Sequence, residues 1–295
     1  MSDPLSQGVG GMKTAFIGLG VMGYPMAGHL KTAGHEVSVF NRSPDKARRW
    51  AAEHYGAAFE TVEEAVGGCE LVVLCVGNDD DVRSVAARVL PAMGEAGVIV
   101  DHTTTSAVVA REMAELAGQS GRFFIDAPVS GGQVGAVNGQ LTIMAGGDAA
   151  AFARIEPVID AYAKAIRRMG EVGTGQLTKM CNQIAIASLV QGVAEALHFA
   201  KRAGLPTDDV LAAISKGAAQ SWQMENRWAT MAEGKFDFGF AVDWMRKDLG
   251  IALDEAARNG ARLESTAMVD TFYSEVQASG GNRWDTSSLV ARLEK

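Results

Sequence analysis

The residues of this 295-residue chain that could do chemistry include a lysine with two amide side chains shortly behind it. Lys179 is followed by Asn182 and Gln183, at spacings that place all three on one face of a helix. A lysine near the start of a helix and partly shielded from water is suited to donating or accepting a proton. Most helical lysines are solvated surface charges, so this pattern by itself is only a candidate acid–base site.

A second candidate site is a serine followed by two glycines, Ser130, Gly131 and Gly132, a short distance behind the apolar run 123–126. Glycines leave backbone N–H groups unobstructed, and consecutive N–H groups beside a hydroxyl form a small concave site that suits a carboxylate. The alternative is a strand-to-turn connection in which the glycines serve backbone geometry only. The first interpretation predicts a small acidic substrate.

A glycine-rich segment points to a cofactor. It lies directly after the apolar run 14–17 and directly before a helix-like segment, 24–33. A strand, a tight glycine turn and a helix N-terminus in that order present free N–H groups and the positive end of the helix to a pyrophosphate. The residues predicted to bind a dinucleotide there are Gly18, Leu19, Gly20, Val21, Met22 and Gly23.

The end of the next apolar run, 36–40, bears on which nicotinamide cofactor is used. An acidic residue there would bond both ribose hydroxyls and repel a 2′-phosphate. This chain has Asn41, Arg42 and Ser43 instead, with Lys46 a turn later, so a phosphate would meet a guanidinium and a hydroxyl. We expect NADP(H) to be favoured and NAD(H) to be possible, the alternative being that Arg42 is a solvated loop charge.

Apolar runs at 71–76 and 98–101 are typical of strands covered on both faces. Ligands of doubly wound sheets bind at the carboxyl ends of the strands, so the loops after these runs should lie against the cofactor. The residues expected to contact it there are Val76, Gly77 and Asn78 after the first run and Thr104 after the second.

The secondary structure that must position these residues differs between the two halves of the chain. Short β-branched runs alternate with helical segments from about residue 12 to 173, whereas only helical periodicity follows. We predict a flexible tail over 1–11, a dinucleotide-binding domain over 12–173, an inter-domain helix over 174–203 and an all-α substrate or oligomerisation domain over 204–295. The fold class is α/β, with a Rossmann-type doubly wound sheet followed by the helical domain.

The long helix predicts association. Its apolar positions cover more than one face, among them Leu189 and Phe199, so we expect it to be buried between neighbours or in a subunit interface. A homodimer or a homotetramer would fit.

Composition excludes several classes of protein. A net charge of −8 argues against nucleic-acid binding, and no apolar run approaches the roughly 20 residues that span a bilayer. Three cysteines without a CxxC pair indicate a reducing, cytoplasmic setting, the N-terminus has no secretory pattern, and no cluster shows metal-ligand spacing.

Taken together, four segments resemble the β-hydroxyacid dehydrogenase family, which includes 3-hydroxyisobutyrate dehydrogenases and tartronate semialdehyde reductases. The resemblance runs from about residue 12 to the C-terminus and is carried by residues 18–27, 126–132, 173–179 and 247–249. It implies that Ser130, Gly131 and Gly132 anchor a substrate carboxylate, that Lys179 is the catalytic acid–base group and that Asn182 orients substrate and lysine. It also places Thr104, Gly77 and Lys247 near the cofactor and Trp222 in the substrate pocket. We expect Asn182 and Gln183 to bind the substrate as well.

The chain departs from the family pattern at one place. We therefore predict the substrate only as a small 3-hydroxy or semialdehyde carboxylic acid. The hydroxyisobutyrate branch usually has two asparagines where this chain has Asn182 and Gln183, a form similar to tartronate semialdehyde reductases. Lys179 counts against an imine reductase, and the short helical part counts against 6-phosphogluconate dehydrogenase. A non-catalytic dinucleotide sensor is a further alternative, because a fold by itself does not give function.

Overall fold

The computed structural model describes residues 11–294. The tail expected over 1–11 therefore lies, apart from its last residue, outside the described residues. The chain forms two compact units, of which the first ends at Lys179 and the second begins at Met180. We call them the sheet unit and the helical unit, and describe each by itself.

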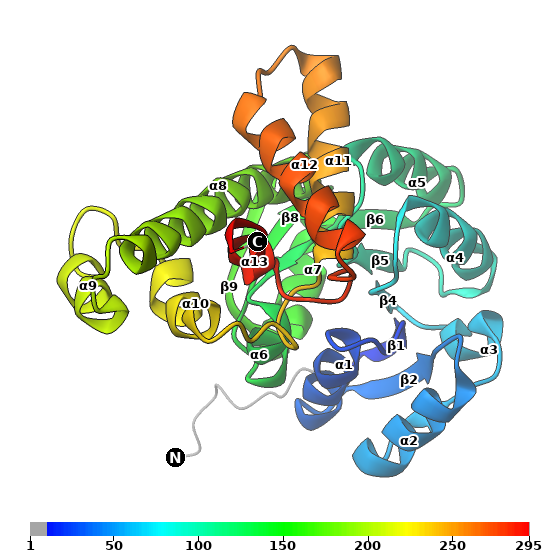
Figure 1. The fold of residues 1–295 in the computed structure, drawn as a ribbon. Coiled ribbons are helices and arrows are strands. Elements are labelled where there is room, and N and C mark those ends of the chain that lie inside the picture. Colours follow the sequence, from blue (N-terminus) through cyan, green and yellow to red (C-terminus); the bar gives the residue numbers. More distant parts are fainter. Residues whose placement is uncertain (1–10, 295) are drawn as a thin grey trace, which may run out of the picture. The chain divides into compact units, whose positions relative to one another are not determined.

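One nine-stranded sheet runs through the sheet unit, with the strand order β3-β2-β1-β4-β5-β6-β8-β7 and β9 paired to β8 (Figure 1). The strands are β1 Lys13–Ile17, β2 Glu36–Phe40, β3 Ala57–Ala58, β4 Leu71–Leu74, β5 Val98–Asp101, β6 Phe123–Asp126, β7 Val129–Ser130, β8 Leu141–Gly146 and β9 Ala163–Gly170. The order from β3 to β6 is that of dinucleotide-binding folds, in which the crevice lies where the order reverses, between β1 and β4.

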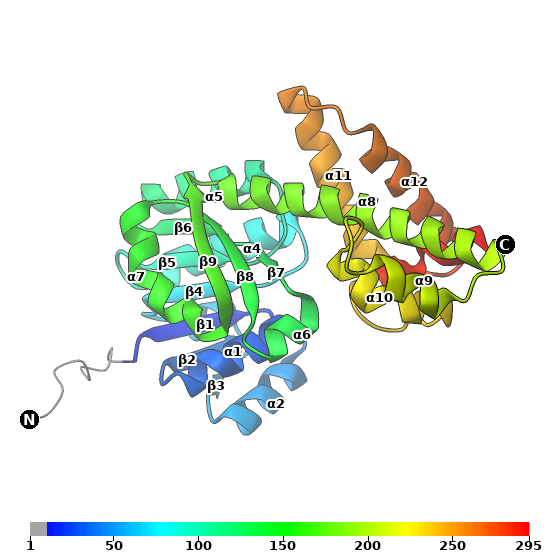
Figure 2. The same cartoon turned by 90° about the vertical axis from the view of Figure 1, so that its left-hand side faces the viewer.

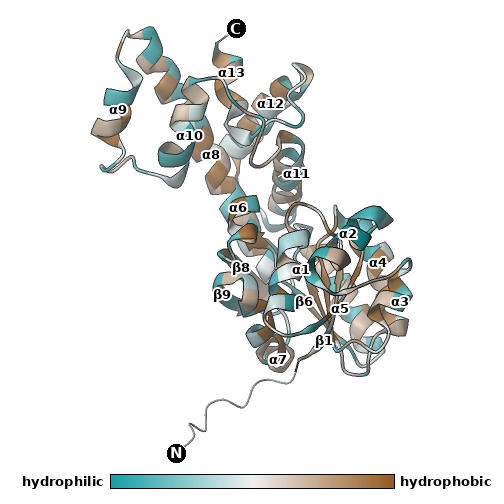
Figure 3. Cartoon of the chain, turned by 90° about the horizontal axis from the view of Figure 1, so that it is seen from below, coloured by the Kyte–Doolittle hydropathy of each residue, from teal (hydrophilic) through white to brown (hydrophobic). Residues whose placement is uncertain are grey.

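Alternating side chains of the central strands pack into two separate cores. Phe16 of β1 points to the core beneath α1, α2, α6 and α7, whereas Ala15 and Ile17 point to the core beneath α3, α4 and α5. Figure 3 shows the central strands as hydrophobic and α2 as largely hydrophilic. These helices are α1 Gly23–Thr32, α2 Pro44–His54, α3 Val62–Val66, α4 Asp79–Ala92, α5 Ala107–Gln119, α6 Gly132–Val137, α7 Ala149–Ile159 and the 3₁₀ turn η1 Asp160–Tyr162.

The apolar runs predicted as strands are all strands, and β4 ends at Leu74, two residues before the predicted end. The sheet is not parallel throughout, because β8 pairs antiparallel with both β6 and β7. The sequence pattern missed β9, whose residues alternate between half-buried and exposed, so no continuous apolar run marks it. It also missed the two-residue strands β3 and β7.

The helical unit is built on α8, Thr174–Arg202, which begins in the sheet unit and confirms the predicted long helix (Figure 2). Its further helices are α9 Thr207–Ile214, α10 Trp222–Ala232, α11 Val242–Asn259, α12 Glu264–Ala278, the 3₁₀ turn η2 Thr286–Ser288 and α13 Leu289–Leu293. Buried side chains of α8, α10, α11, α12 and α13 form one core around Trp228 and Tyr273. As predicted, no strand lies between residues 176 and 294.

Two expectations about α8 concern its apolar residues. A window of α8 has a mean hydropathy of 1.2, so by length and composition only this helix could cross a membrane. Core helices pass the same test, and Ala187, Val190 and Val193 are buried in the core of the helical unit. The helix is not buried on every side, because Leu189 and Phe199 are 44% and 70% exposed.

Candidate active site

The glycine turn after β1 has the geometry that the sequence predicts for binding a pyrophosphate. Gly18 adopts φ +99°, and a Cβ on it would lie 2.2 Å from the carbonyl oxygen of Cys75. A Cβ on Gly23 would lie 2.0 Å from the carbonyl oxygen of Gly18, so close packing of helix on turn excludes any side chain there. Gly20 is exposed, and a Cβ on it would meet no atom within 4 Å. The turn therefore needs Gly18 and Gly23 for its own fold and leaves open space at Gly20, as a dinucleotide requires.

Asn41, at the end of β2, holds this turn. Its Oδ1 accepts a hydrogen bond of 2.9 Å from the backbone N–H of Leu19, and its Nδ2 donates to the Ser43 carbonyl at 3.1 Å. Arg42, Ser43 and Lys46 are exposed beside it, and among the described residues Arg42 forms no ion pair. The guanidinium is thus available to an anion at the end of β2.

The loops after β4 and β5 are joined to each other. The backbone N–H of Val76 donates to Thr103 Oγ1 at 3.0 Å, and the Ser106 hydroxyl donates to Asp79 Oδ2 at 2.5 Å. Asn78 caps α4 by accepting from the N–H of Asp81 at 2.9 Å. The loop after β4, which is expected to contact the cofactor, is therefore hydrogen-bonded to the loop after β5 that contains Thr103 and Ser106.

A buried carboxylate fastens the start of α8 to this edge of the sheet. Asp126, at the end of β6, accepts hydrogen bonds from the N–H groups of Gly173 and Gln176 at 2.7 and 2.8 Å. Burial raises the pKa of the Asp126 carboxyl to about 7, although these N–H bonds act to lower it. The side chain of Gln176 in turn accepts from the N–H of Thr105 and donates to the Thr103 carbonyl, at 3.1 and 2.8 Å.

Lys179 follows Gln176 by one turn of α8 and is only 7% exposed. It is not a solvated surface lysine, which was the alternative left open by the sequence. The hydrogen bonds of Gln176 tie this part of α8 to Thr103 and Thr105, the neighbours of Thr104. The sheet unit thus brings the lysine to the same edge as the glycine turn.

Ser130 ends the short strand β7 and is half-buried. Gly131 and Gly132 follow it with φ of +130° and +60°, and both are exposed. Two successive positive φ values turn the chain sharply and leave the backbone beside the Ser130 hydroxyl uncovered by side chains. An uncovered backbone beside a hydroxyl is compatible with a small anion site.

In the helical unit, the amides of α8 meet a carboxylate of α11. Gln183 is 2% exposed and donates from Nε2 to Asp248 Oδ2 at 2.7 Å, while its Oε1 accepts from Asn182 Nδ2 at 2.8 Å. Lys247 Nζ lies 3.4 Å from Asp248 Oδ1 and 5.7 Å from the centre of the Trp244 ring. Lys247 and Asp248 lie in the second turn of α11.

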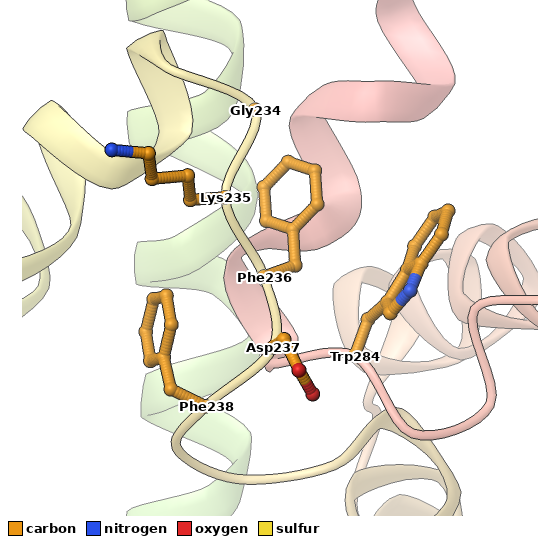
Figure 4. A pocket seen from close by; sticks show the side chains of 6 residues that line it. All are labelled: Gly234, Lys235, Phe236, Asp237, Phe238 and Trp284. Carbon is orange, nitrogen blue, oxygen red and sulfur yellow. The ribbon is translucent and has the colours of Figure 1, made fainter.

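Trp222 is the first residue of α10 and is 58% exposed. The Arg227 guanidinium lies 4.8 Å from its ring centre and 5.0 Å from that of Phe238. Next to this stack is a pocket lined by Gly234, Lys235, Phe236, Asp237, Phe238 and Trp284. Figure 4 shows the rings of Phe236 and Trp284 on one side of the loop and the side chains of Lys235 and Phe238 on the other. The sequence singled out no residue of this pocket.

The sequence also missed Asp126, Gln176 and His102 as parts of the candidate site. His102 is fully buried, and burial lowers its pKa to about 4. Its Nδ1 faces the Ala127 carbonyl at 2.5 Å and must carry the hydrogen, so Nε2 accepts from the Tyr162 hydroxyl at 2.8 Å. Their positions in the sequence could have indicated all three residues, because Asp126 and His102 lie at the carboxyl ends of strands and Gln176 lies at the start of α8. Over residues 11–294, no group of three His, Cys, Asp or Glu side chains could hold a metal ion.

Comparison with known proteins agrees with this fold. The family model described as the NAD binding domain of 6-phosphogluconate dehydrogenase matches residues 13–172, and the one described as NAD-binding of NADP-dependent 3-hydroxyisobutyrate dehydrogenase matches residues 173–293. An uncharacterized oxidoreductase of Shewanella frigidimarina is 59% identical over 96% of this chain and 98% of its own length.

Two further matches have named activities. The 2-hydroxy-3-oxopropionate reductase of Escherichia coli is 34% identical over 96% of this chain and 97% of its own length. The structure of Mycobacterium tuberculosis 3-hydroxyisobutyrate dehydrogenase with L-serine superposes with a TM-score of 0.89 at 33% identity, covering 96% of this chain and all of that one.

Proposed function

Because the chain belongs to the 3-hydroxyisobutyrate dehydrogenase family of NAD(P)-binding oxidoreductases, we propose that it interconverts a small 3-hydroxy carboxylic acid and its semialdehyde. The observation that supports this most is the continuous set of hydrogen bonds along the carboxyl edge of the sheet. It runs from Val76 through Thr103 to Gln176, one turn before the buried Lys179. A non-catalytic dinucleotide sensor would not need a buried lysine there.

Each group of residues then has one task. The N–H groups at Gly131 and Gly132 and the Ser130 hydroxyl bind the substrate carboxylate, which fixes the end of the substrate that does not react. Lys179 donates a proton to the carbonyl oxygen during reduction and accepts one from the hydroxyl during oxidation. Asn182 orients the lysine and the substrate oxygen. A bound nicotinamide dinucleotide supplies or accepts the hydride.

The residues of the glycine turn fit such a cofactor, because the position of a Cβ on Gly20 is open space. We propose a preference for NADP(H), in which the exposed Arg42 and the Ser43 hydroxyl bind the 2′-phosphate. No carboxylate replaces Asn41 at the end of β2, so no acidic side chain at that position repels a phosphate.

The exposed side of α8 supports a second proposal, that the protein is a homodimer or homotetramer. Leu189 and Phe199 are large apolar residues exposed on the helix that forms the core of the helical unit. Light scattering after gel filtration measures the assembly directly, and Phe199→Lys should lower its mass. We also propose a cytoplasmic location, because a chain with three cysteines and no CxxC pair is typical of a reducing compartment.

A panel of substrates tests the proposed reaction. Reduction of malonate, methylmalonate and tartronate semialdehydes is followed by the oxidation of NADPH and, separately, of NADH. L-Serine, 3-hydroxyisobutyrate and glycerate are tested in the other direction with NADP⁺. We expect turnover of at least one semialdehyde, with a higher kcat/KM for NADPH than for NADH. Turnover of a cyclic imine but of no semialdehyde would contradict the proposal.

A further inference from the structure

Three polar side chains of the helical unit form a chain that we call the amide relay: Asn182 and Gln183 of α8 and Asp248 of α11. Asn182 Nδ2 donates to Gln183 Oε1 at 2.8 Å, and Gln183 Nε2 donates to Asp248 Oδ2 at 2.7 Å. Gln183 and Asp248 are each 2% exposed, whereas Asn182 is half-buried. Both polar atoms of the Gln183 side chain are therefore bonded inside the helical unit.

The carboxylate sets the direction of the relay. An ionised carboxylate only accepts hydrogen bonds, so Gln183 must turn its NH₂ group toward Asp248. Lys247 Nζ forms an ion pair with the other carboxylate oxygen, Oδ1, at 3.4 Å. The Gln183 oxygen then has to face Asn182, which must present its own NH₂ group. The carbonyl oxygen of Asn182, Oδ1, is left as the amide atom that faces away from Gln183.

We propose that Gln183 is a positioning residue that acts through Asn182, and that the amide relay makes Asn182 present a hydrogen-bond acceptor to the reacting groups. This inference rests on the proposed function, because Asn182 follows Lys179 on the same face of α8. An acceptor at that place bonds the lysine ammonium or a substrate hydroxyl, both of which carry hydrogens. An amide turned the other way would offer them a donor instead.

The relay also gives the departure from paired asparagines a physical reason. Gln183 reaches Asp248 Oδ2 while still accepting from Asn182, and an asparagine is shorter by one methylene. Gln183→Asn should therefore break one of the two bonds. The length of the side chain at 183 then controls the orientation of the amide at 182, which makes this position a determinant of the reaction without contact with the substrate.

A double-mutant cycle tests the proposal on the full-length protein. Gln183→Met removes both bonds at nearly constant volume, and we expect kcat to fall about tenfold or more, since misplaced groups cost rate steeply. The Kd for NADPH, measured by fluorescence, should stay within about twofold. In the Asn182→Ala background the same change should cost less than about twofold in kcat, because Gln183 acts only through Asn182. Equal losses in both backgrounds would overturn the proposal.

Two further variants keep the test interpretable. Gln191→Met is the matched control, because Gln191 lies on α8, is 5% exposed and bonds Glu195 rather than the relay. It should leave kcat unchanged. Asp248→Asn keeps the shape of the side chain but no longer imposes the direction, so we expect a smaller loss of kcat that also disappears in the Asn182→Ala background.

A measurement without turnover separates this inference from the proposed function. In ¹⁵N spectra of the wild-type protein, the side-chain NH₂ hydrogens of Asn182 should exchange slowly with solvent, and Gln183→Met should make that exchange at least about tenfold faster. Fast exchange in the wild-type protein would overturn the relay. Inactivity of the wild-type protein toward every semialdehyde, with slow Asn182 exchange, would overturn the proposed function alone.

Discussion

In the sheet unit the candidate site residues are held through the main chain, whereas in the helical unit they are held through side chains. Asn41, Asp126 and Gln176 each bond a backbone N–H group of the segment that they fasten. In the amide relay, Asn182, Gln183 and Asp248 are joined through their side chains. A site fixed by backbone geometry should keep its shape when a reactive side chain is removed, whereas in a site fixed by side chains the loss of one side chain should reorient its neighbour.

The largest expected effect is a loss of kcat on removal of Lys179, a residue of the sheet unit. Lys179→Ala should lower kcat for the best semialdehyde by about 10²- to 10⁴-fold, because a positioned acid–base group contributes that much. The backbone bonds of Asp126 and Gln176 remain, so the Kd for NADPH should change by less than about threefold. Steady-state kinetics and fluorescence titration measure the two quantities.

Lys164→Ala is the control for this change, because Lys164 is an exposed lysine of β9 in the same unit. It should leave kcat unaltered. If Lys179→Ala retained the wild-type rate, the assigned acid–base role would be wrong.

The second prediction separates two glycines of one turn. Gly23→Ala places a Cβ 2.0 Å from a backbone carbonyl oxygen, so we expect a loss of about 2–4 kcal/mol of unfolding free energy, at or above the usual cost of overpacking. Gly20→Ala meets no atom, so its Tm should stay within about 2 °C while the Kd for NADPH rises about tenfold or more. Urea unfolding and cofactor titration of both variants measure this.

We assign Gly23 to the fold and Gly20 to cofactor binding. The reverse pattern, a stable Gly23→Ala variant and an unfolded Gly20→Ala variant, would contradict this assignment.

The third prediction concerns the pH dependence of the sheet unit. Burial raises the pKa of Asp126 from the ordinary 3.8 to about 7, so the folded state favours the protonated carboxyl. The stability contributed by this group is complete below pH 4 and is lost as the pH rises through 7. Between pH 5 and 7, the unfolding free energy of the wild type relative to Asp126→Asn should fall by about 1 kcal/mol per pH unit.

Urea unfolding of both proteins at several pH values measures that difference, and the other titrating groups cancel in it. A difference that rises with pH over this interval would show that the backbone N–H bonds outweigh burial at Asp126.

The smallest expected effect is at the exposed end of β2. Arg42→Ala should raise the Kd for NADPH about tenfold and leave the Kd for NADH within about twofold, because only NADPH carries the 2′-phosphate. Arg167→Ala, which removes an exposed arginine from β9, is the matched control. Equal weakening of both cofactors would show that Arg42 does not discriminate between them.

Much of the sheet unit could be predicted because its signals are local. The apolar runs named from the sequence coincide with β1, β2, β4, β5 and β6, and the spacing of Gly18, Gly20 and Gly23 predicted a turn whose geometry agrees. The half-buried alternation of β9 and the antiparallel pairing of β8 gave no such signal, because they depend on what covers each face.

By itself the sequence determined the order of elements, the cofactor turn, the family resemblance and the candidate residues Ser130 and Lys179. Only the tertiary structure decided that Asp126 and Gln176 fasten α8 to the sheet, and that Gln183 meets Asp248 rather than solvent. The reason is physical. A turn or a strand is specified by residues that are neighbours in the chain, whereas these hydrogen bonds join residues 50 to 73 positions apart and exist only once the core has brought them together.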